Sequence, residues 1–281
     1  MLKTRVITAV LLLAVLLPAL FYPGPEPFCA LALVFITAAG WEWGRLNGCR
    51  QPVSVLLAVT CLLLCLAAWA LGWLWAPSRT LWLVVGAAWV LGSAALLRAG
   101  VRGWGRLPLG LRLAGGVLVL CFAWLAMAQA RFIGVNFLLS GLVLVWVADI
   151  AAYFAGRALG GRFSRSKLAA SISPGKSWEG VWGGMLGVVL LAGFWCWIDQ
   201  HWQLQVPSLY SRLAAQGLWL LALGAIFLAA MSVVGDLVES LVKRSAGAKD
   251  SSGLLPGHGG VLDRVDALLP VLPLVMMLAT H

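Results

Sequence analysis

Nine long apolar stretches without charged residues constrain this chain more than any other feature. They are residues 6–25, 27–41, 51–78, 80–97, 113–130, 132–148, 180–198, 213–235 and 267–281. A helix that crosses a bilayer needs about 20 predominantly apolar residues, with roughly 17 as the lower limit. Seven stretches meet this requirement directly, whereas 27–41 and 267–281 need flanking residues. Because the chain is 62% hydrophobic and only 11% charged, we predict an all-α polytopic integral membrane protein with about nine transmembrane helices, eight being the alternative count.

The distribution of basic residues predicts the orientation of these helices. With the N-terminus in the cytoplasm, only Arg79, Arg131 and Arg212 of the 20 lysines and arginines fall on the outer side. Short cytoplasmic loops carry an excess of Lys and Arg in membrane proteins. The sequence therefore predicts a cytoplasmic N-terminus and a net charge of +10 that serves topology and contact with anionic membrane lipids. No single basic groove is present, so we expect no nucleic-acid partner.

The chain divides by chemistry into two parts of one membrane domain. Residues 1–130 carry few polar groups and predict a scaffold of transmembrane helices, with contacts to lipid or a second copy left open. Within it, Trp41-Glu42-Trp43 is typical of an anchor at the membrane interface. Residues 131–281 predict a catalytic region with cytoplasmic loops at 156–178 and 243–262. The six cysteines form no CxxC pair, and we expect them to be buried apolar side chains.

Half of the acidic residues lie in a short C-terminal segment. Five of the ten, Asp236, Glu239, Asp250, Asp263 and Asp266, fall between positions 236 and 266. Asp236, Glu239, Ser240 and Lys243 stand at i, i+3, i+4 and i+7, so they share one face of the helix predicted over 213–242. An unpaired carboxylate at the end of an apolar span is costly, which predicts a cation or a basic partner. A structural ion pair with Arg244 or Arg264 is the alternative for Asp236.

A glycine-rich loop follows this helix. Its residues are Pro256-Gly257-His258-Gly259-Gly260, and Asp263-Arg264-Val265-Asp266 comes directly after. Glycines let the backbone approach a ligand and expose N–H donors. Carboxylates beside such a loop are typical ligands of Mg²⁺. The sequence thus predicts Mg²⁺-assisted chemistry on a phosphorylated substrate, with a nucleotide favoured.

A third polar segment precedes the predicted helix over 180–198. It reads Ser173-Pro174-Gly175-Lys176-Ser177-Trp178-Glu179-Gly180. A turn that leads into a helix N-terminus with a lysine and hydroxyl groups suits an anion. The spacing of a Walker A loop is absent, so this segment alone does not identify a nucleotide site.

At these residues the sequence resembles the phosphatidate cytidylyltransferase (CDP-diacylglycerol synthase) family. Residues 240–266 match the family signature at every specified position: Ser240, Val242, Lys243, Arg244, Lys249, Asp250, Ser252, Leu255, Pro256, His258, Gly259, Gly260, Val261, Asp263, Arg264, Val265 and Asp266. Two further family elements resemble residues 149–157, with Asp149, Tyr153 and Arg157, and residues 173–180. In the second of these, Gly175 stands where the family has a lysine.

The resemblance implies that CTP and phosphatidate react with Mg²⁺ to give CDP-diacylglycerol and pyrophosphate, at the cytoplasmic face of a bacterial inner membrane. It implies three sets of site residues. The catalytic set is Asp236, Asp263, Lys243 and Arg264. The substrate-binding set is Ser173, Lys176, Ser177, Glu179, Arg244, Lys249, Asp250, His258, Gly259 and Gly260. The metal ligands are Asp236, Asp263, Asp266 and Glu239, for one Mg²⁺ with a second metal ion left open.

Several alternatives stay open at this stage. A related enzyme could act on another lipid phosphate, or a CTP-dependent polyprenol kinase could release CDP instead of pyrophosphate. A transporter could use the acidic residues as a cation path, although these residues gather at one edge of the bilayer. His258 could hold the loop or contact phosphate, and the motif Gly183-Gly184-x-x-Gly187 permits the close helix packing that a homodimer would use.

Overall fold

The structure is a computed structural model that describes residues 2–164 and 167–280, so Arg165 and Ser166 of the predicted 156–178 loop lie outside the described residues. The described part is helical, with two isolated β-bridges and no strands. Its helices are α1 (Leu2–Phe21), α2 (Glu26–Leu46), α3 (Gln51–Ala70), α4 (Arg79–Arg106), α5 (Leu109–Ile133), α6 (Val135–Leu159), α7 (Trp178–His201), α8 (Leu209–Gln216), α9 (Leu218–Ser245), α10 (Leu262–Val265) and α11 (Leu268–Ala279).

Eight of these helices are long and apolar enough to cross a membrane, counting only the described residues. They are α1 to α7 and α9, and they coincide with the first eight apolar stretches. The ninth stretch, 267–281, instead forms the 12-residue helix α11. At 1.5 Å per residue such a helix is about 18 Å long, which is short of the ~30 Å hydrocarbon core. The described residues thus support the alternative count of eight spans.

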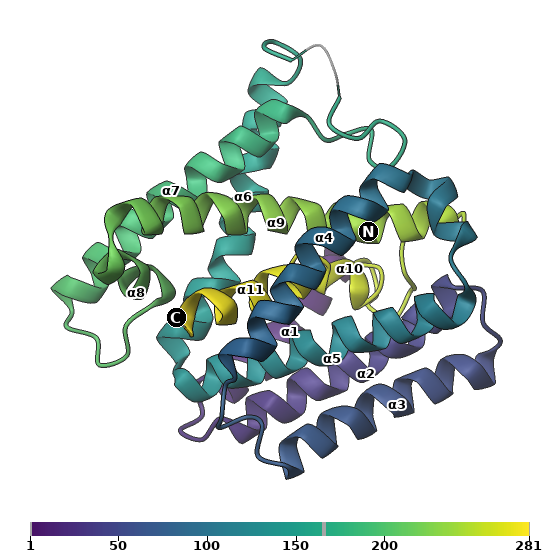
Figure 1. The fold of residues 1–281 in the computed structure, drawn as a ribbon, viewed down its shortest axis with the longest axis horizontal. Helices are drawn as coiled ribbons and strands as arrows, with labels where there is room; N and C mark the ends of the chain where they lie inside the picture. Colours follow the sequence, from purple (N-terminus) through teal and green to yellow (C-terminus); the bar gives the residue numbers. More distant parts are fainter. Residues whose placement is uncertain (1, 165–166, 281) are drawn as a thin grey trace.

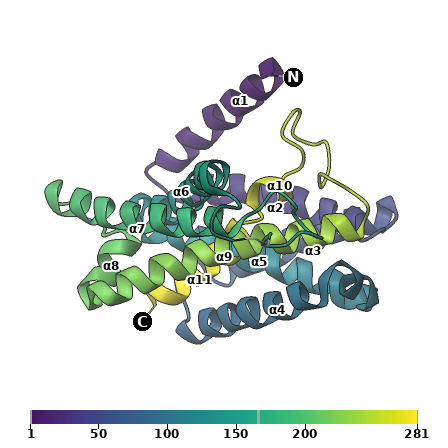
Figure 2. The ribbon, with the colours of Figure 1, turned by 90° about the horizontal axis from the view of Figure 1, so that it is seen from above.

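Helix α11 lies in the middle of the bundle, where it packs against α4, α5 and α9. Its side chains from Leu269 to Met276, including that of Pro273, are all buried. Helix α1, by contrast, extends away from the other helices in Figure 2. Only 6% of its apolar segment Thr4–Phe21 is buried inside the protein. A helix with exposed apolar side chains all round is compatible with lipid contact.

Helices α6 and α7 pack tightly against each other, and glycines of α7 make this approach possible. A Cβ atom on Gly183 would stand 2.1 Å from the Cβ of Ala155, and one on Gly187 would stand 2.6 Å from the Cβ of Ala151. Gly184 faces the carbonyl oxygen of Ala148 in the same way. The small-residue motif of α7 therefore packs within the chain, against α6, and does not need a second copy as its partner.

The connections between the helices sort into two groups, and contacts join members of the same group. On one side, Arg5 donates to the Gly257 carbonyl (2.9 Å) and Trp43 donates to the Arg112 carbonyl (3.1 Å). Lys176 forms an ion pair with Asp236. All of these residues lie in segments predicted to face the cytoplasm.

The connections predicted to lie on the outer side also contact one another and the neighbouring ends of the predicted spans. Arg131 donates to the Tyr22 carbonyl at 2.5 Å. Asn136 donates to Asp199 at 2.9 Å and to the Val206 carbonyl at 2.8 Å. The structure therefore separates the two groups as the distribution of basic residues predicts, and which group faces the cytoplasm stays a prediction.

Candidate active site

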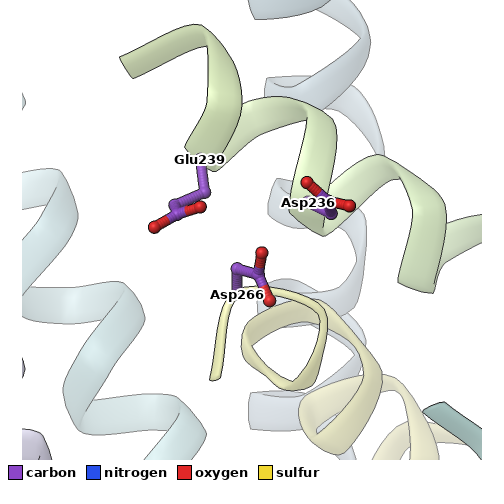
Figure 3. A group of neighbouring side chains, drawn as sticks. All are labelled: Asp236, Glu239 and Asp266. Carbon is purple, nitrogen blue, oxygen red and sulfur yellow. The ribbon is translucent and has the colours of Figure 1, made fainter. Parts of the chain in front are cut away.

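Three carboxylates meet at the C-terminal half of α9. Asp236 and Glu239 project from α9, and Asp266 projects from the segment between α10 and α11 (Figure 3). One oxygen of each carboxylate lies within 4.8 Å of the others. Glu239 is buried, and the two aspartates are half-buried. This carboxylate group contains three of the four predicted metal ligands.

The packing of Gly235 explains why Asp266 comes so close to α9. A Cβ atom on Gly235 would stand 2.6 Å from the Asp266 carbonyl oxygen and 2.8 Å from Cγ of Pro270. The absence of a side chain at 235 therefore lets the 266–270 backbone lie directly against the helix. Asp236 and Glu239, three positions apart, share the face of α9 that this segment covers.

Lys243 links the carboxylate group to the predicted glycine loop. Its Nζ lies 2.5 Å from Oε2 of Glu239 and 2.6 Å from Oδ1 of Asp263. The lysine side chain is 13% exposed, and both carboxylates are 5% exposed. A buried ammonium between two carboxylates is well compensated, and removal of any one partner leaves a charge without its counterpart.

Asp263, the fourth predicted metal ligand, binds the loop around it. Its Oδ2 accepts hydrogen bonds from the Ser251 and Gly260 backbone N–H groups, both at 2.8 Å, and from Ser251 Oγ at 2.9 Å. Burial alone would raise the pKa of Asp263, but Lys243 and the two N–H groups hold this pKa below its ordinary value. Its role as a metal ligand stays a prediction.

Asp266 lies in a different electrostatic environment. Burial and the nearby carboxylate of Asp236 raise the pKa of Asp266 from its ordinary value of 3.8 to about 7. One oxygen of Asp266 accepts from the Ala267 N–H at 2.8 Å. Two carboxylates that repel each other in this way favour a shared cation.

The segment before α7 reaches the same place. Ser173 closes a turn in which Lys176 N–H donates to its carbonyl at 3.2 Å. Lys176 then forms an ion pair with Asp236, and Arg244 donates to the Ile172 carbonyl at 3.4 Å. The structure thus brings the turn that contains Ser173 and Lys176, some 60 residues earlier in the chain, to α9 through Lys176 and the Ile172 carbonyl.

The other predicted site residues fall into two kinds. Arg244, Lys249, Asp250 and Arg264 are exposed around the carboxylate group and the glycine loop. Ser177 and Glu179 instead hold the chain. Ser177 caps α7 by accepting from the Gly180 N–H at 3.2 Å. Buried Glu179 accepts from the backbone N–H groups of Phe163 (3.1 Å) and Ser164 (2.7 Å). Substrate binding by these residues stays a prediction.

The glycine loop has a tight backbone. Gly257 and Gly259 have φ values of 78° and 84°, in the region that favours glycine. The His258 N–H donates to the Leu255 carbonyl at 2.8 Å, and His258 Nδ1 is buried without a hydrogen-bond partner among the described residues. The N–H hydrogen bond fits a role of His258 in holding the loop, and the unpartnered Nδ1 fits a contact with phosphate.

Sequence reasoning missed Glu42. The expected interface anchor at Trp41-Glu42-Trp43 is wrong for the glutamate, whose carboxylate is 0% exposed. Its Oε1 accepts from Ser252 Oγ (2.5 Å) and the Val261 N–H (2.9 Å). Its Oε2 accepts from the Leu262 N–H (2.7 Å) and lies 3.2 Å from Ser251 Oγ, whose single O–H it shares with Asp263 Oδ2 (2.9 Å). The signal available in the sequence was a carboxylate that directly follows the apolar stretch 27–41.

The carboxylate group suits a divalent cation. Oε1 of Glu239 is buried, and no hydrogen-bond donor within 2–164 or 167–280 reaches it. A buried carboxylate oxygen without a donor is unfavourable unless a cation or an unseen donor satisfies it. Three oxygen ligands from carboxylates match the preference of Mg²⁺. Asp236, Glu239 and Asp266 are therefore the residues that fit such an ion.

Comparison with known proteins gives a consistent result over the full length. The sequence model of the cytidylyltransferase family matches residues 3–281. The chain is 38% identical to the phosphatidate cytidylyltransferase of Pseudomonas aeruginosa over 278 residues, which cover 97% of this chain and 95% of the relative. It is 36% identical to the enzyme of the same name from Haemophilus influenzae, with 97% and 96% covered, and 36% identical to that of Brucella suis, with 98% and 92% covered.

Proposed function

This chain belongs to the cytidylyltransferase family, and on this basis we propose how its residues perform the transfer of a cytidylyl group from CTP to phosphatidate. The products are CDP-diacylglycerol and pyrophosphate, and the reaction belongs to phospholipid biosynthesis. The protein is an integral membrane enzyme, which agrees with its eight apolar helices. The observation that carries the residue assignment is the carboxylate group of Asp236, Glu239 and Asp266, with Lys176 paired to Asp236 and Lys243 paired to Glu239.

The reaction joins two polyanions. A phosphate oxygen of phosphatidate attacks the α-phosphorus of CTP, and the bond from that phosphorus to the bridging oxygen of pyrophosphate breaks. The attacking oxygen already carries negative charge, so no general base is needed. The protein must overcome repulsion between the substrates and align the attack.

Mg²⁺ is the cation that we propose for the carboxylate group, with Asp236, Glu239 and Asp266 as its protein ligands. When bound there, the ion would neutralise phosphate charge and help to orient the triphosphate. The choice follows from the all-oxygen ligand set and from the buried Oε1 of Glu239 that lacks a donor among the described residues.

Cationic side chains around this group supply the remaining positive charge. Lys176 pairs with Asp236 from the turn before α7, and Arg244, at the end of α9, contacts the Ile172 carbonyl in the segment that leads into this turn. Exposed Lys249 and Arg264 are free to reach phosphate oxygens of CTP or of the lipid. We place this site on the cytoplasmic face of a bacterial inner membrane, where the distribution of basic residues puts it and CTP is available.

The test is pyrophosphate release by the detergent-purified protein given CTP, Mg²⁺ and phosphatidate. We expect pyrophosphate release that depends on the lipid and on Mg²⁺, together with formation of CDP-diacylglycerol. In Asp266→Asn both pyrophosphate release and CDP-diacylglycerol formation should be lost. Diacylglycerol in place of phosphatidate serves as the control without a nucleophilic phosphate. Release of CDP would indicate a kinase, and turnover with other lipid phosphates alone would assign a different substrate.

A further inference from the structure

We infer that Glu42, on α2, is a positioning residue of the catalytic site, although it lies in the part of the chain that the sequence marks as scaffold. The inference rests on the function proposed above and adds a residue to it. Glu42 does not touch the carboxylate group. It acts on the segment that carries Asp263 and Asp266, through a buried carboxylate that four donor groups reach.

The four donors to Glu42 come from both ends of the glycine loop. Ser251 and Ser252 lie before the loop, and Val261 and Leu262 lie after it. One carboxylate therefore joins two chain positions ten residues apart and closes the loop at its base. The Leu262 N–H also begins α10, so Glu42 sets where the helical turn with Asp263 starts.

A neutral side chain cannot replace this carboxylate. Two of the donors are backbone N–H groups, which cannot become acceptors, and one of them contacts each oxygen. A glutamine would turn an N–H₂ group toward at least one backbone N–H and lose that hydrogen bond. A buried N–H left without an acceptor is unfavourable, so the loop base would shift.

Continuous contacts lead from Glu42 to the carboxylate group. Ser251 Oγ contacts both Glu42 Oε2 (3.2 Å) and Asp263 Oδ2 (2.9 Å). Asp263 binds Lys243, and Lys243 binds Glu239. Displacement of the loop base would therefore move Asp263, release Lys243 and change the charge that surrounds Glu239.

Gly260 provides independent support for the same contact. A Cβ atom at 260 would stand 2.4 Å from Oε1 of Glu42 and 2.0 Å from Oγ of Ser251. A glycine fits at this position because Ser251 Oγ and the Glu42 carboxylate together fill the space beside it. Gly260→Ala would thus disturb the contact from the loop side while Glu42 itself is unchanged.

The test compares Glu42→Gln with Glu26→Gln, the same substitution at the other end of α2. Three measurements are made on protein that elutes as a single folded species in detergent: kcat and KM for both substrates, Mn²⁺ affinity by electron paramagnetic resonance, and hydrogen exchange of residues 251–266. For Glu42→Gln we expect kcat to fall by about tenfold to hundredfold, with a smaller change in KM. We also expect weaker Mn²⁺ binding and faster exchange in 251–266, while Glu26→Gln matches the wild type.

Two outcomes would overturn the inference. In one, Glu42→Gln keeps the wild-type kcat and exchange rates. In the other, activity falls only as much as the folded fraction, with Mn²⁺ affinity unchanged in the folded protein, which would make Glu42 merely structural. Gly260→Ala should reproduce the exchange and Mn²⁺ effects. If the wild type made no CDP-diacylglycerol, the proposed function would fail, whereas exchange and Mn²⁺ binding would still test Glu42.

Discussion

The backbone of α9 at Gly235 lies so close to Asp266 that a Cβ atom on residue 235 would stand 2.6 Å from the Asp266 carbonyl oxygen. The obstacle is backbone, which cannot rotate away as a flexible side chain can. The same segment carries the Asp266 carboxylate toward Asp236 and Glu239. One missing side chain on α9 thus determines how near the third carboxylate comes to the first two.

Gly235→Ala should therefore impair catalysis by moving Asp266 away from α9. Overpacking of this kind typically costs about 1–3 kcal/mol of stability, and we expect pyrophosphate release to fall at least as far as Mn²⁺ affinity does. The control is Gly193→Ala on α7, where an added Cβ meets nothing within 4 Å. Wild-type activity and Mn²⁺ affinity in Gly235→Ala would show that the close approach is not needed.

The ion pair of Lys176 with Asp236 leads to two opposite effects of one substitution. In Lys176→Met, Asp236 loses its ammonium partner, so Mn²⁺ should bind more tightly in the absence of nucleotide. The gain should be at most about fivefold, because ion pairs that are partly exposed contribute about 1 kcal/mol or less. In the same variant KM for CTP should rise, since the phosphate contact that we propose for Lys176 would be lost.

Electron paramagnetic resonance of Mn²⁺ and initial-rate kinetics measure these two effects separately. Lys176→Arg keeps the charge and serves as the matched variant, in which both effects should be smaller. Weaker Mn²⁺ binding in Lys176→Met would mean that the lysine supports the cation and does not compete with it.

The sequence predicted nine spans, with eight as the alternative, and the eight that the described residues support were recognisable because charge-free stretches of about 20 residues have few alternatives to a membrane helix. The ninth stretch was wrong as a span because it forms the short buried helix α11. The sequence also predicted that Asp236 and Glu239 share a face, since helical spacing places them together. Glu42 could not be assigned in this way. Its donors lie more than 200 positions away, and no local pattern connects α2 to the glycine loop. The sequence also did not show that Asp263 accepts hydrogen bonds from Ser251 and Gly260. These contacts depend on how the loop folds back on the residue that follows it, which residue types and spacing do not specify.

Asp266 should make the stability of the metal-free protein depend on pH. Its folded pKa of about 7 lies above the ordinary 3.8, so the folded state holds a proton that the unfolded chain releases between about pH 4 and pH 7. The free energy of unfolding should therefore fall as the pH rises through this window, by at most about 1.4 kcal/mol per pH unit. Asp266→Asn lacks the group and should lose this part of the pH dependence.

Thermal unfolding in EDTA, from pH 4 to pH 8, compares the two proteins. Above pH 7 the variant should be at least as stable as the wild type, because repulsion between Asp266 and Asp236 is removed. Added Mg²⁺ should raise the Tm of the wild type and leave that of Asp266→Asn unchanged. Parallel pH profiles for both proteins would contradict the assignment of Asp266.

The orientation of the site can be tested with cysteines in a background that lacks the six native ones. Gly253→Cys marks the segment just before the glycine loop, at an exposed position with no atom beyond its chain neighbours within 4 Å of an added Cβ. Gln205→Cys marks the exposed connection between α7 and α8. If the basic residues indicate the cytoplasm correctly, a membrane-impermeant maleimide applied to intact spheroplasts should label Gln205→Cys and spare Gly253→Cys. Lysis should make both cysteines reactive. The reverse pattern in intact spheroplasts would place the carboxylate group on the side without CTP, and the proposed site would then have no access to its nucleotide.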